Sequence, residues 1–160
     1  MPVVLRGEPL AKARNVYGQT PLVDNDPTRP NEAFFEHVDW VIEQAEALGL
    51  WVALLPTWGS MVGPVVDWLG TNPVIFDEEN ARAYGEFLGK RYRGRNVIWV
   101  LGGDRNPTEE KYVVVWRAMA EGLETGDGGE HLKTFHPQAP FSSSKWLHGE
   151  PWLDFHMIQT

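Results

Sequence analysis

The chain has 160 residues, of which 42% are hydrophobic, and its 22 acidic against 14 basic side chains give a formal net charge of -8. This composition buries enough apolar surface for one compact core, which excludes a disordered chain. The acidic balance argues against nucleic-acid and anionic-membrane partners, because both need a basic face. The chain has no cysteine, so disulfides and thiolate metal sites are excluded.

Apolar runs in the chain are short. The longest, residues 50–56, falls well under the roughly 18 residues that a membrane span needs. The amino terminus lacks the basic region and cleavage site of a signal peptide. Tryptophan is abundant, with eight copies. Core filling accounts for about half of them, and we expect the others to be flat platforms for sugar rings.

The first half of the chain alternates strand and helix patterns. Val3–Leu5 reads as a strand, followed by a polar loop. Asn31 is placed to cap a helix whose apolar residues recur at helical spacing, and Gly49 to stop it. The unbroken apolar run Leu50–Leu55 predicts a strand buried on both faces. A second long loop then extends to residue 73.

Asp77 is placed to cap the next helix. The carboxyl end of this helix gathers four basic residues, Lys90, Arg91, Arg93 and Arg95. We interpret them as complementing the helix dipole. A nucleic-acid patch is the less favoured alternative in an acidic protein.

Further strands are predicted at Asn96–Leu101, Leu132–Phe135 and Leu153–Ile158. Asn106–Glu109 resembles a capping box for a helix that runs to about Leu123. The order of elements predicts an α/β fold with a parallel sheet, in one unit over residues 1–160. Because the longer loops all follow strands, the pattern favours part of a (β/α)8 TIM barrel.

Three predicted strands end in residues that can carry chemistry. Asp104 follows a buried strand and two glycines, which would let a substrate approach its carboxylate. Since Asn106 already takes the cap position, we expect Asp104 to act as a general acid. Trp58 and His136 occupy equivalent positions, as a sugar platform and a polar ligand.

Other chemistries find little support. The histidines lack metal-ligand spacing, and Asp24–Asp26 lacks the glycine and distal glutamate of a calcium loop. Phosphate-binding loops and a serine nucleophile elbow are absent from the sequence. We therefore expect neither a metal nor another cofactor.

Six segments together resemble the domain-of-unknown-function 4038 sugar hydrolases, which include the apiosidase-like glycoside hydrolase family 140. They are Asn15–Gly18, Pro30–Phe35, Leu55–Gly59, Ile98–Asn106, Phe135–Pro137 and Trp152–Phe155. The resemblance implies a TIM barrel whose fourth strand ends in the acid/base carboxylate, here Asp104. The predicted strands then correspond to about strands two to six of eight. No residue matches the strand-seven nucleophile, so we expect a truncated member.

The resemblance implies a hydrolase acting on O-glycosidic bonds of plant cell-wall polysaccharide, apiosidase-like or endoglucanase-like. Trp58 and Tyr17 would stack on sugar rings. The hydroxyl-binding residues would be Asn15, Asp26, Asn106 and His136. The candidates for a second carboxylate are Glu150, Asp154, Asp24, Asp26 and Glu32.

Two alternatives stay open. One is a carbohydrate-binding remnant without turnover, and the other is a doubly wound α/β binding protein, which leaves the strand-end placement of the polar residues unexplained. Because a partial barrel presents open, apolar sheet edges, we also expect a homodimer or higher oligomer.

Overall fold

A three-stranded parallel sheet forms the centre of the computed structural model, which describes residues 14–63, 66–67, 70–71 and 73–160. Its strands are β1 (Val52–Leu54), β4 (Val97–Gly102) and β5 (Lys133–His136), in the spatial order β1, β4, β5. Their positions confirm three of the predicted strands. Because all three run in the same direction, their carboxyl ends lie at one end of the sheet.

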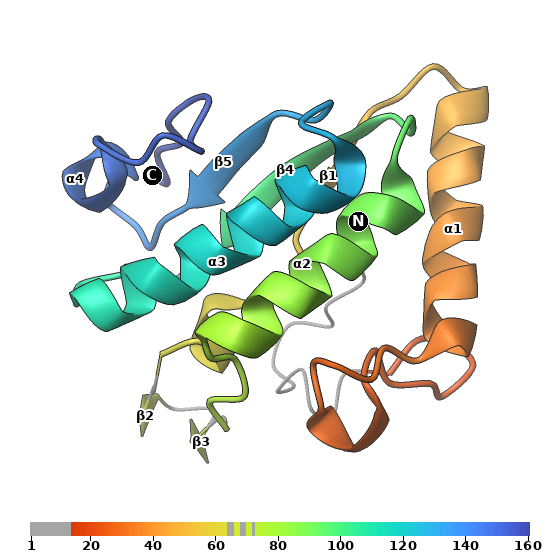
Figure 1. Cartoon of the computed structure of the whole chain (residues 1–160), viewed down its shortest axis with the longest axis horizontal. Coiled ribbons are helices and arrows are strands. Elements are labelled where there is room, and N and C mark those ends of the chain that lie inside the picture. Colours follow the sequence, from red (N-terminus) through yellow and green to blue (C-terminus); the bar gives the residue numbers. More distant parts are fainter. Residues whose placement is uncertain (1–13, 64–65, 68–69, 72) are drawn as a thin grey trace.

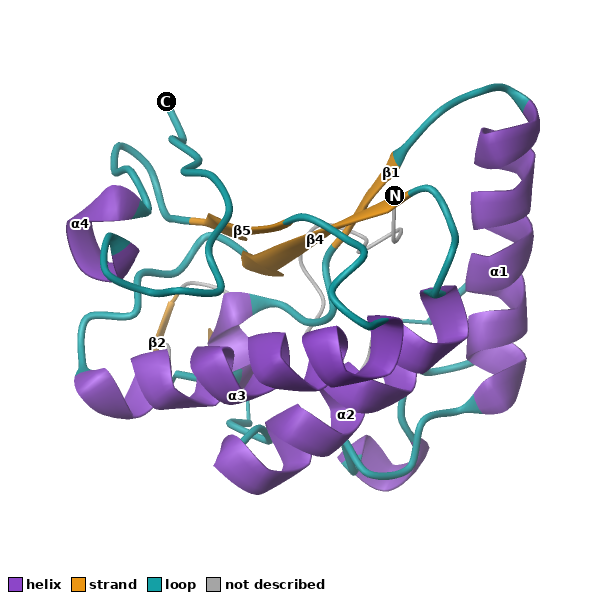
Figure 2. Ribbon diagram, turned by 45° about the horizontal axis from the view of Figure 1, so that its top comes forward, coloured by secondary structure: helices purple, strands orange, loops and turns teal. Residues whose placement is uncertain are grey.

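Three long helices connect and flank these strands: α1 (Glu32–Ala47), α2 (Glu78–Tyr92) and α3 (Glu110–Asp127). Figures 1 and 2 show α2 and α3 side by side across one face of the sheet, with α1 beside them. Parallel strands joined through helices make this an α/β fold, as the sequence predicted.

Glycines allow α2 and α3 to approach backbone to backbone. Gly85 and Gly89 of α2 face Gly122 and Gly126 of α3, one turn apart on each helix. A β-carbon added to Gly89 would lie 2.3 Å from the carbonyl oxygen of Leu123. Real β-carbons essentially never come so close, so the crossing requires glycine.

The remaining elements are short. The segment expected as a long loop after β1 contains a small antiparallel hairpin of β2 (Val66–Asp67) and β3 (Gly70–Thr71). The others are the 3-10 turns η1 (Val23–Asn25) and η2 (Gly59–Met61) and the helix α4 (Ser144–Leu147).

Two of the predicted strands, the first and the last in the chain, are absent from the described sheet for different reasons. Val3–Leu5 lies outside the described residues. The strand expected at Leu153–Ile158 is wrong, because this segment forms only an isolated bridge from Ile158. It meets β5 through one backbone hydrogen bond, from the Asp154 amide to the Lys133 carbonyl oxygen at 2.9 Å, and through side chains. The Asp154 side chain accepts from the Lys133 amide at 2.7 Å, and the Thr134 hydroxyl donates to the Phe155 carbonyl oxygen at 2.6 Å.

Of the three predicted helix caps, the structure confirms one and corrects two. Asp77 caps α2 in a reciprocal box with Asn80. Asn31 precedes α1, but its side chain donates to the carbonyl oxygen of Thr20 instead of capping. The box expected at Asn106–Glu109 is wrong, because α3 starts one residue after Glu109 and extends to Asp127, beyond the predicted end.

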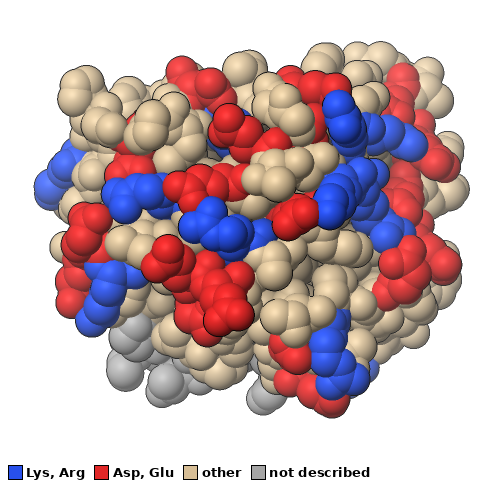
Figure 3. Space-filling view, viewed as in Figure 1, with Lys and Arg blue, Asp and Glu red and all other residues tan. Residues whose placement is uncertain are grey.

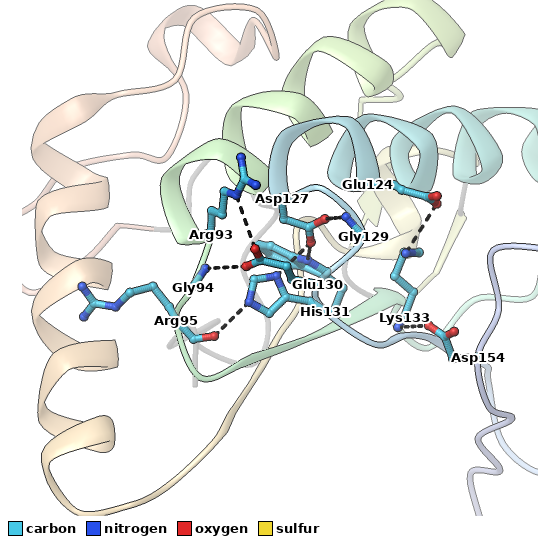
Figure 4. Close-up of polar contacts among 11 residues, drawn as sticks. Arg93, Gly94, Arg95, Glu124, Asp127, Gly129, Glu130, His131, Lys133 and Asp154 are labelled. Carbon is cyan, nitrogen blue, oxygen red and sulfur yellow. Dashed lines mark hydrogen bonds and ion pairs between the residues drawn. The ribbon is translucent and has the colours of Figure 1, made fainter.

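A buried polar cluster ties the end of α3 to the amino ends of β4 and β5 (Figure 4). The Asp127 carboxylate accepts from the Trp99 indole at 2.9 Å and lies 2.8 Å from the Nδ1 atom of His131. The other ring nitrogen of His131 lies 2.9 Å from the carbonyl oxygen of Arg95. Buried polar groups need such partners, so the cluster fixes this end of the fold.

The four basic residues near the end of α2 are neutralised by carboxylates. Arg91 binds Asp39 and Glu32, and Arg95 binds Glu46. Lys90 and Arg93 also form ion pairs. Figure 3 shows acidic and basic side chains interleaved over this face. Ion pairing between elements therefore explains the basic run better than the helix dipole alone. Within the described residues, no helix is long and apolar enough to cross a membrane.

The tryptophans divide between core and surface. Three are buried, namely Trp99, Trp116 and Trp152. Two are more than half exposed, Trp40 and Trp51, and two are half-buried, Trp58 and Trp146. Trp68 lies outside the described residues.

Candidate active site

The turn after β4 places Asp104 at the carboxyl end of the sheet. The amide of Gly103 donates to the carbonyl oxygen of His136 at 3.0 Å, which ties this turn to the end of β5. Gly102, Gly103 and Asp104 all have positive φ, at 86°, 118° and 49°. Backbone of this kind is strained for residues other than glycine, and Asp104 adopts it at the tip of a strand.

The two glycines serve packing. A β-carbon on Gly103 would lie 2.8 Å from the ring of Trp58, and one on Gly102 would lie 2.7 Å from both the His136 carbonyl oxygen and the Phe135 ring. From the sequence, we expected the two glycines to leave room for a substrate to approach the Asp104 carboxylate. The structure fills it with the two aromatic side chains, so glycine brings Trp58 against the turn that carries Asp104.

Asp104, His136 and Trp58 lie together. The Asp104 amide donates to the Nδ1 atom of His136 at 3.4 Å, and the Oδ1 atom of Asp104 lies 3.9 Å from the same nitrogen. The rings of His136 and Trp58 are 6.4 Å apart. Because Nδ1 accepts a hydrogen bond, the neutral imidazole carries its proton on Nε2. This leaves an N–H donor for an oxygen-bearing ligand.

The cluster is open to solvent on one side. The Asp104 side chain is 40% exposed and that of His136 is 26% exposed. Trp58 is half-buried, and the preceding Thr57 is buried. A carboxylate, an imidazole and an indole that share a partly exposed place can together bind and protonate a polyhydroxylated ligand.

Sequence reasoning missed a fourth member of the cluster, Gln159. Its side-chain amide donates to the Oδ1 atom of Asp104 at 2.7 Å. Gln159 follows an apolar segment and has no motif of its own. Only the folded chain brings it to residue 104, which is 55 positions away in the sequence.

Asn106 lies nearby in a different arrangement. Its Oδ1 atom accepts from the Gln138 amide at 3.0 Å, which joins the turn after β4 to the loop after β5. It lines a cleft of about 250 Å³ with Gly59, Arg105 and Tyr112. Asn106 therefore does not cap α3, and its side-chain oxygen is taken by the Gln138 amide.

The other three predicted binding residues are engaged within their own loop. The side-chain Oδ1 atom of Asn15 accepts from the backbone amides of Tyr17 and Gln19, both at 3.0 Å. The hydroxyl and amide of Thr28 hold the pKa of Asp26 below its usual range. No contact in the described part of the chain joins these residues to Asp104. Tyr17 is 71% exposed and lies edge-on to His37 of α1.

The candidates for a second carboxylate are occupied elsewhere. Glu150 is bound by Arg117 at 2.7 Å and by the Trp152 indole at 2.8 Å. Asp154 is bound to the amide of Lys133, the first residue of β5, at the other end of the sheet from Asp104. The remaining candidates are likewise bound: Asp24 to Arg29, Asp26 to Thr28 and Glu32 to Arg91.

Among the described residues, no group of three or more histidine or acidic side chains is arranged to hold a metal ion.

Comparison with known proteins places the chain in a family. The sequence model of the apiosidase-like catalytic domain matches residues 3–160, nearly the whole chain. The chain belongs to the apiosidase-like catalytic domain family. No curated protein sequence matches it.

Two solved structures resemble this apiosidase-like chain. One, described as a glycoside hydrolase, has 30% sequence identity and a TM-score of 0.76 over 93% of the chain. The other, a glycoside hydrolase family 5 protein from Bacteroides vulgatus, has 32% identity and a TM-score of 0.74 over 92% of it. The chain covers only 32% and 31% of these two proteins, about a third of each.

Proposed function

We propose that the chain supplies the general acid of a glycoside hydrolase that cleaves O-glycosidic bonds in plant cell-wall polysaccharide, apiosidase-like or endoglucanase-like. The observation that carries this proposal is the Asp104 carboxylate, held at a strand end beside His136 and Trp58 and 40% exposed. Membership in the apiosidase-like family supports it. In this proposal residues 1–160 are a single incomplete barrel domain that corresponds to about strands two to six of eight.

Three residues of the cluster, and two outside it, have parts in the proposed reaction. The Asp104 carboxyl donates its proton to the glycosidic oxygen while the bond from that oxygen to the anomeric carbon breaks. Trp58 stacks on a sugar ring, and His136 and Asn106 donate hydrogen bonds to hydroxyls. Tyr17, at 71% exposure, is the candidate platform for sugar units farther along a polysaccharide.

The second carboxylate would come from outside the cluster described here. Retention needs it about 5 Å from Asp104, and inversion needs roughly 6.5 to 9.5 Å. The five candidates within the chain are held by other partners. A carboxylate from a further segment or another protomer would therefore complete the site.

The test is release of reducing sugars from apiose-containing pectin side chains and β-glucans. Because the proposal takes the second carboxylate from a further segment or another protomer, the rate is measured in an assembly that supplies it. There we expect Asp104→Asn to lower the rate about 10²- to 10⁴-fold, the usual contribution of a general acid. The matched control is Glu36→Gln, an exposed carboxylate of α1 that should keep the wild-type rate. An unchanged rate in Asp104→Asn would refute the assignment. Binding seen by tryptophan fluorescence without sugar release would support the carbohydrate-binding alternative.

We also propose that the chain associates with a second copy through the β1 side of the sheet. Several large apolar side chains near this strand are more than half exposed, namely Leu48, Leu50 and Trp51. The β5 side is covered by Asp154 and its neighbours. Light scattering at micromolar concentration should give the mass of a dimer or larger, and a monomer mass would contradict the proposal.

A further inference from the structure

The contact between Gln159 and Asp104 distinguishes the two oxygens of the carboxylate. The Nε2 atom of Gln159 donates to Oδ1 at 2.7 Å, and the closest nitrogen of His136 also lies nearer this oxygen, at 3.9 Å. The Oδ2 atom has no hydrogen-bond partner among the residues that the structure describes. Two oxygens that are chemically equal in a free carboxylate are therefore unequal here.

Gln159 is held in place by its own backbone. Its amide donates to the carbonyl oxygen of Phe141 at 3.2 Å, and the preceding Ile158 forms a bridge with Ser142. The Oε1 atom of the same side chain is buried and has no hydrogen-bond partner among the described residues, so the contact with Asp104 is the one that orients the amide group. The amide group thus reaches Asp104 from a segment fixed on a neighbouring loop.

The orientation of the amide follows from the chemistry of its partner. An ionised carboxylate only accepts hydrogen bonds, so the NH2 group and not the oxygen must face it. A hydrogen bond to a charged oxygen is about twice as strong as one between neutral groups. The contact therefore strengthens as negative charge grows on Asp104.

We infer that Gln159 is a positioning residue for Asp104, which binds Oδ1 and leaves Oδ2 as the oxygen that carries the proton to the leaving group. The role as proton donor rests on the proposed function. When the proton passes from Oδ2 to the glycosidic oxygen, that oxygen takes the electron pair of the breaking bond. Asp104 becomes a carboxylate, and the amide of Gln159 stabilises the new charge through Oδ1.

The contact itself is tested without enzymatic activity. The side-chain amide resonance of Gln159 is followed by NMR while the pH falls from 7 to 3, across the range around pH 4 in which carboxyl groups ordinarily titrate. We expect a titration step in the wild type and its loss in Asp104→Asn. The exposed Gln44 of α1 supplies the reference amide, which should show no such step. A wild type without a step, or a step that survives in Asp104→Asn, would overturn the inference.

The positioning role is tested by kinetics on two leaving groups. A sugar leaving group needs the proton, whereas dinitrophenolate leaves without it. We expect Gln159→Leu to lower kcat about 10- to 100-fold on the sugar leaving group and far less on the dinitrophenyl glycoside. The control, Gln44→Leu, should match the wild type on both.

The outcomes separate the two proposals. Equal losses on both substrates would show a merely structural effect and overturn the role of Gln159. If Asp104→Asn itself fails to discriminate between the leaving groups, the proposed general acid is wrong. If the chain hydrolyses neither substrate, the NMR titration still decides whether Gln159 holds Asp104.

Discussion

Replacing Gly89 with alanine would place a methyl group 2.3 Å from the carbonyl oxygen of Leu123. This is about 1 Å short of the 3.4 Å at which ordinary van der Waals contact begins. The backbone nitrogen of Asp127 also lies 2.9 Å from the new carbon, so the methyl group meets main chain on two sides and the helices must separate. Such overpacking costs about 3 kcal/mol at the upper end of its range. Alanine returns about 1 kcal/mol of helix propensity, which leaves a loss of about 2 kcal/mol.

The assay is thermal unfolding followed by circular dichroism. A loss of about 2 kcal/mol should lower the Tm by about 4–8 °C in a domain of this size. Gly149→Ala is the matched control, because nothing lies within 4 Å of its added β-carbon. Its stability should stay within about 0.5 kcal/mol of the wild type. A Tm for Gly89→Ala equal to or above that of the wild type would show that helix propensity outweighs the contact.

Three further substitutions probe the site and its supports. Gly103→Ala forces a methyl group into the Trp58 ring and should cost about 1–3 kcal/mol, seen in melts and near-UV circular dichroism. Asp127→Ala removes the carboxylate that binds the buried Trp99 indole and His131 ring, and urea unfolding should show a free energy of unfolding lower by about 3 kcal/mol. Arg117 holds the pKa of Glu150 below the ordinary 4.5, so their bond stabilises the fold above that pH and is lost on acidification through the lowered pKa. Glu150→Gln should therefore be less stable by about 1–2 kcal/mol at pH 7, and the difference should shrink by pH 3.

The sheet could be predicted because its strands leave a strong local signal. The apolar run at residues 50–55 contains β1, and the runs at 96–101 and 132–135 cover all but the last residue of β4 and β5. The segment 153–158 carries a similar apolar character without forming a strand. There, the Asp154 side chain accepts from the Lys133 amide, where the backbone carbonyl of a strand partner would otherwise have accepted. Propensity cannot detect such a substitution, because it depends on which segment lies alongside.

The site was predictable to the same extent. Asp104, Trp58 and His136 follow strands, and the ends of parallel strands converge, so their meeting could be expected from order alone. The contacts that refine the site join distant segments, with Gln159 lying 55 residues and Gln138 lying 32 residues from their partners. Asn106 illustrates the consequence: its local sequence matches a cap, but the distant amide of Gln138 takes its side-chain oxygen. The close helix crossing also escaped prediction, since its glycines look like weak helix positions until the partner helix is known.

The side chains along β5 also set a direction for growth of the sheet. Asp154 accepts the Lys133 amide, its own amide donates to the Lys133 carbonyl oxygen, and the Thr134 hydroxyl binds the following segment. A further strand could pair with β5 only by displacing the segment around Asp154, because the amide and the carbonyl oxygen of Lys133 already have hydrogen-bond partners. In the proposed pair, which forms through the β1 side, the β5 side of each copy would stay covered by this segment. The covered edge thus disfavours fibre formation, even for a chain that carries large exposed apolar side chains.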